Sequence, residues 1–306
     1  MDIISIIVPC YNEEESIEYF YKAIDEISKK LEDAELELVF VDDGSKDNTY
    51  EKLCLLHEKD KRVKCISFSR NFGKEAAIFS GLRAGEGDCF VVMDADLQHP
   101  PATILEMYDC WKQGYEVVEG IKKSRGKESG IHKWFAGLFY DMISSSLHID
   151  MRNSSDFKLM DKKVVKELCA LTEKNTFFRA LAYWVGFKST SVSYEVCERV
   201  AGKTKWSYWK LGTYAIRNLT SFTNAPLQII TILGLIFLLV GMVLGVDAIV
   251  SFVKGSTVGG YPSLVLLIVL STGGIMLSLG IIGIYISKIY DEIKNRPQYI
   301  IRDSKK

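Results

Sequence analysis

The stretch VVMDADLQHPP, residues 91–101, ends an apolar run at two aspartates one residue apart and continues into two prolines. Asp94 and Asp96 repel each other, and burying either carboxylate is costly, so we expect a positive charge between them. The apolar run CFVVMD at residues 89–94 predicts a buried strand, and Pro101 suits the first turn of the next helix. This order of strand, acidic turn and helix indicates a fold in which ligands bind at the carboxyl ends of strands.

The preceding residues repeat the same order of strand, polar turn and helix. Strands are expected at residues 3–9, 36–43, 63–69, 89–94 and 115–120. Helices are expected between them at residues 16–31, 47–59 and 74–84. Short apolar runs that alternate with helices predict an α/β fold with a mixed, mostly parallel sheet flanked by helices.

Polar residues follow four of these strands. In chain order they are Pro9, Tyr11, Asn12 and Glu13; Asp42 and Asp43; Asn71 and Lys74; and Asp94 and Asp96. Because parallel strands end at the same edge of a sheet, we expect these side chains to form one site.

Two carboxylates on one short loop can hold Mg²⁺ or Mn²⁺, which take their remaining ligands from substrate phosphates and water. Asp94 and Asp96 are therefore candidate metal ligands, and His99 is a candidate third one. The alternatives are a solvated turn or helix cap for the aspartates and a structural hydrogen bond for the histidine.

Composition excludes some classes of function. The 38 basic and 39 acidic residues nearly balance, so net charge gives no sign of nucleic-acid binding. The seven cysteines stand far apart without a C-x-x-C pair, which indicates buried thiols in a reducing compartment.

The C-terminal third is strongly apolar. Residues 229–252 carry one charge, Asp247, and residues 263–287 carry none. A spanning helix needs about 20 apolar residues, so both segments qualify as transmembrane helices rather than buried core helices. Basic residues precede the first segment and follow the second, whereas the connection holds only Lys254. This asymmetry predicts a multi-pass protein of the cell membrane with both termini in the cytoplasm.

Aromatic and basic residues alternate just before the first apolar segment. Trp206, Tyr208, Trp209 and Tyr214 are mixed with Lys205, Lys210 and Arg217. This mixture favours a helix that lies in the membrane interface, and residues 131–143 are a second candidate.

The motifs resemble family 2 glycosyltransferases of GT-A fold. The resemblance rests on IIVPCYNEEESI (6–17), LVFVDDGSKDNT (38–49), SRNFGKEAAIFSGL (69–82) and MDADLQHPP (93–101). SSDFKLMD (154–161) and ERVAGKTKWSYWKL (198–211), followed by two apolar segments, are similar to the polyprenyl-phosphate glycosyltransferases. That group includes dolichol-phosphate mannose synthase and the bactoprenol glucosyltransferases.

The resemblance implies four parts of the chain: a cytoplasmic GT-A catalytic domain at 1–200, interfacial amphipathic helices at 201–228, two transmembrane helices at 229–287 and a cytoplasmic tail at 288–306. It implies transfer of a sugar, with inversion, from a nucleotide sugar to a polyprenyl phosphate such as undecaprenyl phosphate. Two lone transmembrane helices favour a homo-oligomer.

The resemblance also implies roles for the polar residues. Asp96, helped by Asp94, would hold Mg²⁺ or Mn²⁺ on the donor diphosphate. Nucleotide-binding roles are expected for Pro9, Tyr11, Asn12, Glu13, Asp42, Lys74 and Asp94. Arg125, Arg199 and Lys205 would contact the diphosphate or the acceptor phosphate, with a solvated loop or snorkelling at the interface as alternatives.

Asp156 matches the aspartate on the acceptor side of the family's site. The second pKa of a phosphate monoester is about 6, so near neutral pH most of the acceptor already lacks that proton. We therefore expect Asp156 to orient the acceptor or stabilise positive charge on the sugar more than it removes a proton.

UDP-glucose is the expected donor, with UDP-N-acetylglucosamine, UDP-galactose and GDP-mannose as alternatives. A processive polysaccharide synthase would carry a Q-x-x-R-W motif and more apolar segments, and neither is present. The alternative from a different functional class is a noncatalytic membrane anchor that binds a nucleotide sugar. Such a protein would not need Asp156.

Overall fold

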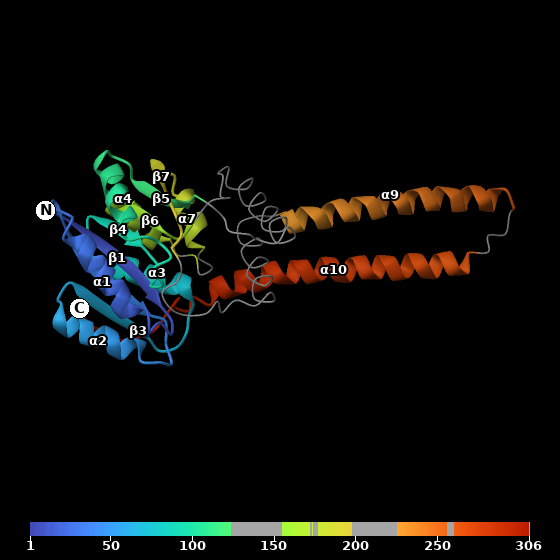
Figure 1. Cartoon of the computed structure of the whole chain (residues 1–306). Helices are drawn as coiled ribbons and strands as arrows, with labels where there is room; N and C mark the ends of the chain where they lie inside the picture. The colour runs from blue at the N-terminus through green and yellow to red at the C-terminus, as the bar shows by residue number, and fades with distance from the viewer. Residues whose placement is uncertain (124–154, 172, 174–176, 198–224, 256–259, 306) are drawn as a thin grey trace. The chain divides into compact units, whose positions relative to one another are not determined.

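The computed structural model describes residues 1–123, 155–171, 173, 177–197, 225–255 and 260–305 (Figure 1). The chain divides into two units, one of residues 1–213 with 297–306 and one of residues 214–296. Both candidate interfacial segments, except for the last residues of 201–228, lie outside the described residues.

The first unit is built on a mixed sheet that has eight strands in its described residues. Its elements in chain order are β1 (Asp2–Cys10), α1 (Ile17–Ser28), β2 (Ala34–Asp42), α2 (Thr49–Lys59), β3 (Val63–Phe68), α3 (Lys74–Ala84), β4 (Cys89–Val92), α4 (Thr103–Lys112), β5 (Val117–Lys122), β6 (Lys158–Asp161), α6 (Lys162–Ala170), α7 (Phe178–Trp184), β7 (Ser189–Tyr194) and β8 (Ile301–Lys305). The strand order is β7-β5-β6-β4-β1-β2-β3-β8, and β6 and β8 run antiparallel to their neighbours.

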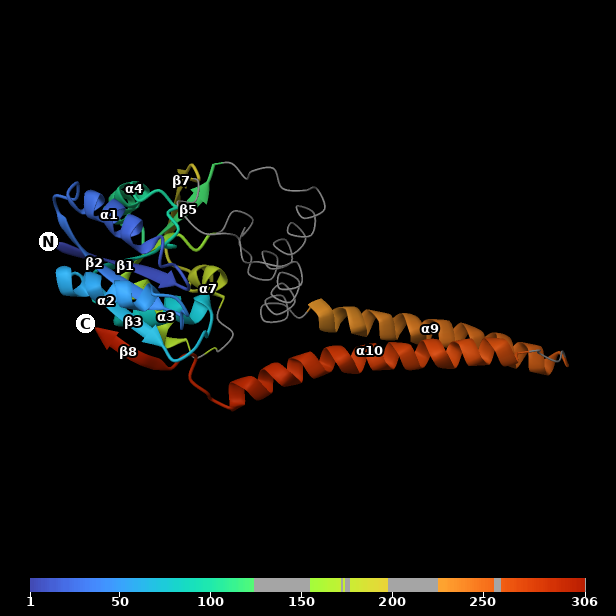
Figure 2. The same ribbon diagram turned by 60° about the horizontal axis from the view of Figure 1, so that its bottom comes forward.

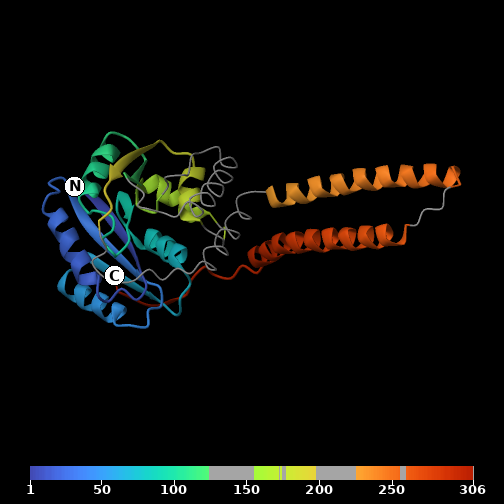
Figure 3. The same ribbon diagram turned by 45° about the vertical axis from the view of Figure 1, so that its right-hand side comes forward.

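Helices cover both faces of this sheet (Figure 3). On one face Phe20 of α1 packs with alternate residues of β1 and β2 in the main core, including Phe40, whose ring lies 5.8 Å from that of Phe20. On the other face Gly81 of α3 lies so close to Ile7 that a Cβ there would approach a methyl carbon to 2.3 Å. Strands buried on both faces explain why each reads as a continuous apolar run.

The predicted strands and helices of the first 120 residues are confirmed, with small shifts at their ends. The helix predicted at 74–84 has those bounds, whereas the helix after the prolines begins at Thr103, so Pro101 lies in the preceding turn and not in the first helical turn. Six of the eight described strands run in one direction, as the prediction of a mostly parallel sheet required.

The segment predicted as a plain tail contributes a strand (Figure 2). β8 pairs antiparallel with β3, and the amide of Ser69 donates to the carbonyl of Ile300 at 3.0 Å. The ring of Tyr299 stacks on Phe68 with 4.9 Å between centroids. The first unit therefore extends beyond the predicted domain of residues 1–200 and includes residues 297–306.

The second unit contains two long helices, α9 (Ala225–Val253) and α10 (Tyr261–Ile293). Their most apolar parts, Leu227–Ser251 and Leu267–Ile293, have mean hydropathies of 2.9 and 2.2, and none of either is buried. By length and composition, both are able to cross a membrane. A core helix of similar composition would be largely buried.

Candidate active site

The turns after β1 and β2 are bonded to each other at the carboxyl edge of the sheet. The amide of Asn12 donates to the hydroxyl of Ser45 at 2.9 Å, and the amide of Lys46 donates to Oδ1 of Asn12 at 2.8 Å. Asn12 has a φ of 53°, a left-handed conformation that asparagine tolerates better than most residues. Pro9, Tyr11 and Glu13 lie half-buried beside it.

Asp42, the last residue of β2, is only 2% exposed. Its Oδ1 accepts from the amide of Ser45 at 3.0 Å, and its Oδ2 accepts from the hydroxyl of Ser67 at 2.8 Å. The carboxylate of Asp42 therefore holds its own turn and the end of β3. Any hydrogen bond to a nucleobase would use its remaining lone pairs.

Asp43 organises the loop that leads into α3. Its two oxygens accept from the amides of Phe72 and Gly73 at 2.6 and 2.9 Å. Burial raises the pKa of Asp43 to about 6, against the effect of these two amides. Gly44 follows with a φ of 65°, and a Cβ there would lie 2.4 Å from the carbonyl carbon of Arg70. A glycine is required because the two loops approach so closely.

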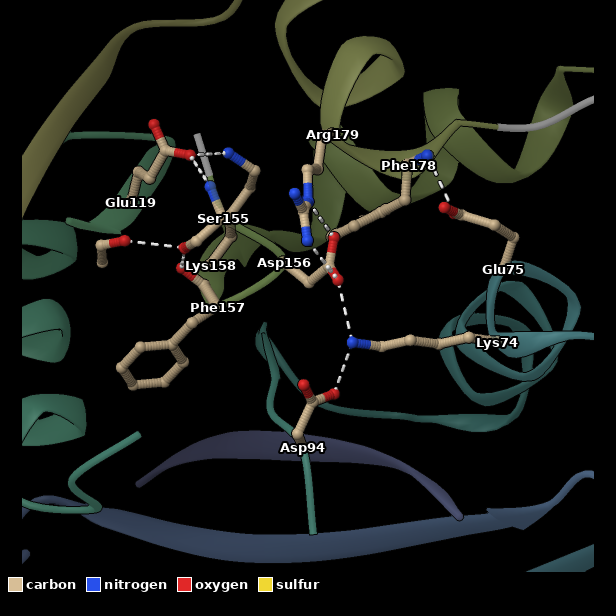
Figure 4. A network of polar contacts seen from close by, with 11 residues as sticks. Lys74, Glu75, Asp94, Glu119, Ser155, Asp156, Phe157, Lys158, Phe178 and Arg179 are labelled. Atoms are coloured by element: carbon tan, nitrogen blue, oxygen red, sulfur yellow. Dashed lines mark hydrogen bonds and ion pairs between the residues drawn. The ribbon is translucent and has the colours of Figure 1, made fainter. Parts of the chain in front are cut away.

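Lys74, the first residue of α3, lies between two carboxylates (Figure 4). Its Nζ is 2.6 Å from Oδ1 of Asp94 and 2.8 Å from Oδ2 of Asp156. Burial favours a lower pKa for Lys74, but the two carboxylates outweigh burial and raise it. A positive charge was expected between Asp94 and Asp96, whereas the structure places Lys74 between Asp94 and Asp156.

Arg179 holds the other side of Asp156. Its Nε and Nη2 donate to Oδ1 and Oδ2 at 2.6 and 3.0 Å, a bidentate arrangement that suits guanidinium and carboxylate. Asp156 is 8% exposed. Burial alone would raise its pKa, yet the charges of Lys74 and Arg179 hold that pKa well below its usual range. Asp156 is thus an ionised carboxylate that is paired with two cations.

The acidic turn after β4 has an unusual backbone. Leu97 has a φ of 58°, an uncommon conformation for a bulky side chain, and such strain gathers at functional sites. Asp96 accepts from the amide of Gln98 at 3.1 Å. Burial works against ionisation of Asp94, but the charge of Lys74 lowers its pKa overall.

His99 is 6% exposed and contacts two aromatic rings. It stacks on Phe157 at 4.9 Å between centroids and meets Tyr194 edge-on at 5.6 Å. Burial lowers the pKa of His99, and its Nδ1 has no hydrogen-bond partner among the residues that the structure describes. The structural hydrogen bond considered for this residue is thus not seen at Nδ1, and the ring instead packs against Phe157, which follows Asp156, and Tyr194, which ends β7.

In the described part of the chain, no three His, Cys, Asp or Glu side chains gather closely enough to hold a metal ion by themselves. The three predicted ligands therefore do not form a complete metal cage. Two aspartates on one turn still suit an ion that takes its other ligands from a diphosphate. Asp94 and Asp96 provide such a pair, and Asp94 is 31% exposed in its side chain.

The predicted residues divide into three groups. The structure brings together Lys74, Asp94 and Asp156, and it places the residues after β1 and β2 at the same edge of the sheet. Arg125, Arg199 and Lys205 lie outside the described residues. Arg179 was missed, although a single arginine within the apolar run FFRALAYW is a signal that could have identified it.

Comparison with known proteins shows the family to which the chain belongs. Residues 5–169 match the model of "Glycosyl transferase family 2". An uncharacterized glycosyltransferase of Bacillus subtilis is 42% identical over 98% of this chain and 93% of its own length. A prophage-derived bactoprenol glucosyl transferase of Shigella flexneri is 38% identical over 98% of each chain. A prophage bactoprenol glucosyl transferase homolog of Escherichia coli is 39% identical over 99% of each chain.

Solved structures show the fold alone. Mannosyl-3-phosphoglycerate synthase of Rubrobacter xylanophilus has a TM-score of 0.52 at 16% identity, over 72% of this chain and 73% of that one. A glucosyl-3-phosphoglycerate synthase of Mycobacterium tuberculosis, solved with Mn²⁺, uridine diphosphate and phosphoglyceric acid, has a TM-score of 0.48 at 18% identity, over 70% and 75%. The predicted fold class, a GT-A-like mixed sheet flanked by helices, is confirmed. From the family match and the near-complete overlap with its relatives, the chain belongs to glycosyl transferase family 2.

Proposed function

We propose that this glycosyltransferase transfers glucose from UDP-glucose to a polyprenyl phosphate, with inversion at the anomeric carbon. The observation that carries the proposal is the chain of alternating charges Asp94–Lys74–Asp156–Arg179 beside the acidic turn. These four residues provide, within one site, carboxylates to hold a metal ion on a diphosphate and cations that suit a phosphate. The names of the relatives from Shigella flexneri and Escherichia coli support glucose and a lipid acceptor.

The donor side of the proposed site lies after β1, β2 and β4. Pro9, Tyr11, Asn12, Glu13 and Asp42 would surround the nucleoside, and Asp94 and Asp96 would hold Mg²⁺ or Mn²⁺. When bound there, a divalent ion neutralises the charge that builds on the leaving diphosphate.

The acceptor side is centred on Asp156. An incoming phosphate monoester is largely dianionic near neutral pH, so it can attack without losing a proton to the protein. Because Lys74 and Arg179 keep Asp156 ionised and occupied, its role is to orient these cations and to act through its charge. Arg125, Arg199 and Lys205 are proposed to contact the phosphates of the two substrates.

We infer that α9 and α10 cross the membrane and that residues 201–228 lie at its interface. The sheet of the first unit contains strands that precede α9 in the chain and also β8, which follows α10. We therefore expect the start of α9 and the end of α10 on the same side of the membrane. The basic residues that flank the two helices favour the cytoplasmic side. The same proposal includes self-association of the protein through the two helices. It also includes the division of the chain into residues 1–200, 201–228, 229–287 and 288–306.

The test is sugar transfer by the purified full chain in detergent. Radiolabelled UDP-glucose, UDP-N-acetylglucosamine, UDP-galactose and GDP-mannose would be offered with undecaprenyl phosphate and either Mg²⁺ or Mn²⁺. We expect a labelled lipid from UDP-glucose that requires the metal and is lost in Asp96→Asn. Asp109→Asn is the matched control, since Asp109 is an exposed aspartate on α4.

A lipid product from another donor would retain the reaction and correct the sugar. Binding of a nucleotide sugar without a lipid product from any donor would contradict the proposal and favour the noncatalytic anchor. Equal activity of Asp96→Asn and wild type would contradict the proposed metal site at Asp94 and Asp96.

A further inference from the structure

A second carboxylate, Glu119, lies buried behind Asp156 and plays no part in the site described so far (Figure 4). It belongs to β5 and is 5% exposed. Its Oε1 accepts from the amide of Ser155 at 2.9 Å and from Nζ of Lys158, and its Oε2 accepts from the hydroxyl of Tyr183. A charged side chain inside an apolar strand is costly to bury, so a purely structural position would more often hold an apolar residue.

Two of these contacts are to residues on either side of Asp156, one to the backbone of Ser155 and one to the side chain of Lys158. Ser155 comes directly before it, and the hydroxyl of Ser155 also donates to the carbonyl of Gly120 at 2.6 Å. Lys158 follows two residues after it and is fully buried. Glu119 thus holds the segment from both ends without contacting Asp156 itself.

The third contact leads to the cation on Asp156. Tyr183 and Arg179 are four residues apart on α7, so they lie on the same side of that helix. Tyr183 is bonded to Glu119, and Arg179 is bonded to Asp156. One carboxylate on β5 therefore determines the place of both members of the Asp156–Arg179 pair.

Glu119 and Lys158 are paired with each other inside the protein. The ammonium of Lys158 is bonded to Glu119 and lies 4.4 Å from the ring centroid of Tyr183. Removal of Glu119 alone would leave the buried charge of Lys158 without this partner, so a test must remove the two charges together.

We propose that Glu119 is a positioning residue for glycosyl transfer, which sets the geometry of Asp156 and Arg179 through Ser155, Lys158 and Tyr183. This inference rests on the proposed function, because it concerns the acceptor side of that site. Glu119 lies apart from the turns after β1 and β2 that are proposed to surround the nucleoside, so nucleoside binding should not depend on it.

The test compares two variants that are both free of the buried charges. Glu119→Gln with Lys158→Met keeps an oxygen that can accept from the amide of Ser155. Glu119→Leu with Lys158→Met has the same charge but cannot accept that hydrogen bond. Glu116→Gln is the control, since Glu116 precedes the same strand and accepts from the amide of Lys188 at 3.1 Å.

We expect the leucine pair to lose about tenfold or more in kcat with KM for the nucleotide sugar within about twofold, as for misplaced reacting groups. The glutamine pair should stay within about threefold of wild type, because the anchor of Ser155 is retained. Tyr183→Phe, which removes one hydroxyl from a half-buried side chain, should lower kcat by about threefold with KM unchanged. It serves as the reporter if the leucine pair does not fold.

Equal kcat in the two pairs, or an unchanged kcat in Tyr183→Phe when the leucine pair does not fold, would overturn the positioning role while leaving glycosyl transfer in place. An inactive wild type would instead refute the proposed function. If the wild type is inactive, amide hydrogen exchange at Ser155 still tests whether Glu119 anchors that residue. Faster exchange at Ser155 in the leucine pair than in the glutamine pair supports the anchoring role, and equal exchange refutes it.

Discussion

At the scale of single residues, Asp156 illustrates how its neighbours determine what a carboxylate can do. A general base needs a pKa near the working pH, whereas the charges of Lys74 and Arg179 outweigh burial and hold the pKa of Asp156 far below it. Such a carboxylate accepts a proton poorly. It is well suited to hold two cations in fixed positions.

This environment predicts the pH profile of Asp156→Asn. We expect its transfer rate to fall about tenfold to a hundredfold and to stay parallel to that of wild type from pH 6 to 8, since electrostatic positioning is lost at every pH. The measurement is the initial rate of lipid glycosylation at saturating UDP-glucose across that range. A deficit that disappears as pH rises would show that Asp156 is a base after all.

The proposed donor-side residues could be predicted from the sequence because they follow strands in recognisable turns. Sequence reasoning missed Arg179 and the Glu119–Lys158 pair for a physical reason. Each lies in an apolar run, and local patterns do not show which distant charge neutralises it. The runs VVEG and FKLM each hold one charge, of opposite sign, but it is the pairing of β5 with β6 that brings Glu119 and Lys158 together.

At the scale of elements, α3 and α7 meet at their first residues. Oε2 of Glu75 in α3 accepts from the amide of Phe178, which begins α7, at 2.9 Å. The rings of Phe79 and Phe178 pack edge to face at 6.3 Å. This junction joins the helix that carries Lys74 to the helix that carries Arg179.

The junction predicts a pH dependence of stability. Burial, followed by the charge of Asp156, raises the pKa of Glu75 from its model-compound value of 4.5 to about 7. Between these values the folded chain binds a proton that the unfolded chain releases, so stability falls as pH rises through this window. Glu75→Gln keeps an oxygen that accepts the hydrogen bond from Phe178 but carries no charge. The difference between its Tm and that of wild type should therefore increase in favour of the variant from pH 5 to 8.

The control for Glu75→Gln is Glu15→Gln, a change at an exposed carboxylate before α1. Its Tm should follow that of wild type at every pH. A difference between Glu75→Gln and wild type that stays constant with pH would contradict the raised pKa.

Three strands were not predicted, each for a reason of its own. β6 is only four residues long, and its motif was interpreted as part of the acceptor site. β7 has little apolar content, since its sequence is STSVSY, and β8 is the charged run IRDSK. Edge strands of this kind are short and polar in natural sheets, so hydropathy alone does not reveal them.

At the scale of the whole molecule, β8 returns the chain to the sheet after both apolar helices. The stacking of Tyr299 on Phe68 is the main aromatic contact of this return. Gln298 adds a hydrogen bond from Nε2 to the carbonyl of Glu173 at 2.6 Å. The tail is therefore attached by side chains as well as by the strand ladder.

This attachment predicts the effect of Tyr299→Ala. Loss of an aromatic pair and its buried area should cost about 1–2 kcal/mol, which corresponds to a Tm about 2–6 °C lower in a domain of this size. Tyr19→Ala removes a tyrosine that is 55% exposed on α1 and should leave Tm unchanged. Equal thermal unfolding curves for the two variants would mean that the stacking of Tyr299 on Phe68 adds nothing to stability.

The place of β8 in the chain also has a consequence for biosynthesis. A ribosome makes the protein from its N-terminus, so β3 and the other strands emerge before α9 and α10, and β8 emerges after both. Until then β3 is an open sheet edge, able to pair with strands of other nascent chains. A covered edge at β3 is thus a sign that synthesis has already passed both apolar helices.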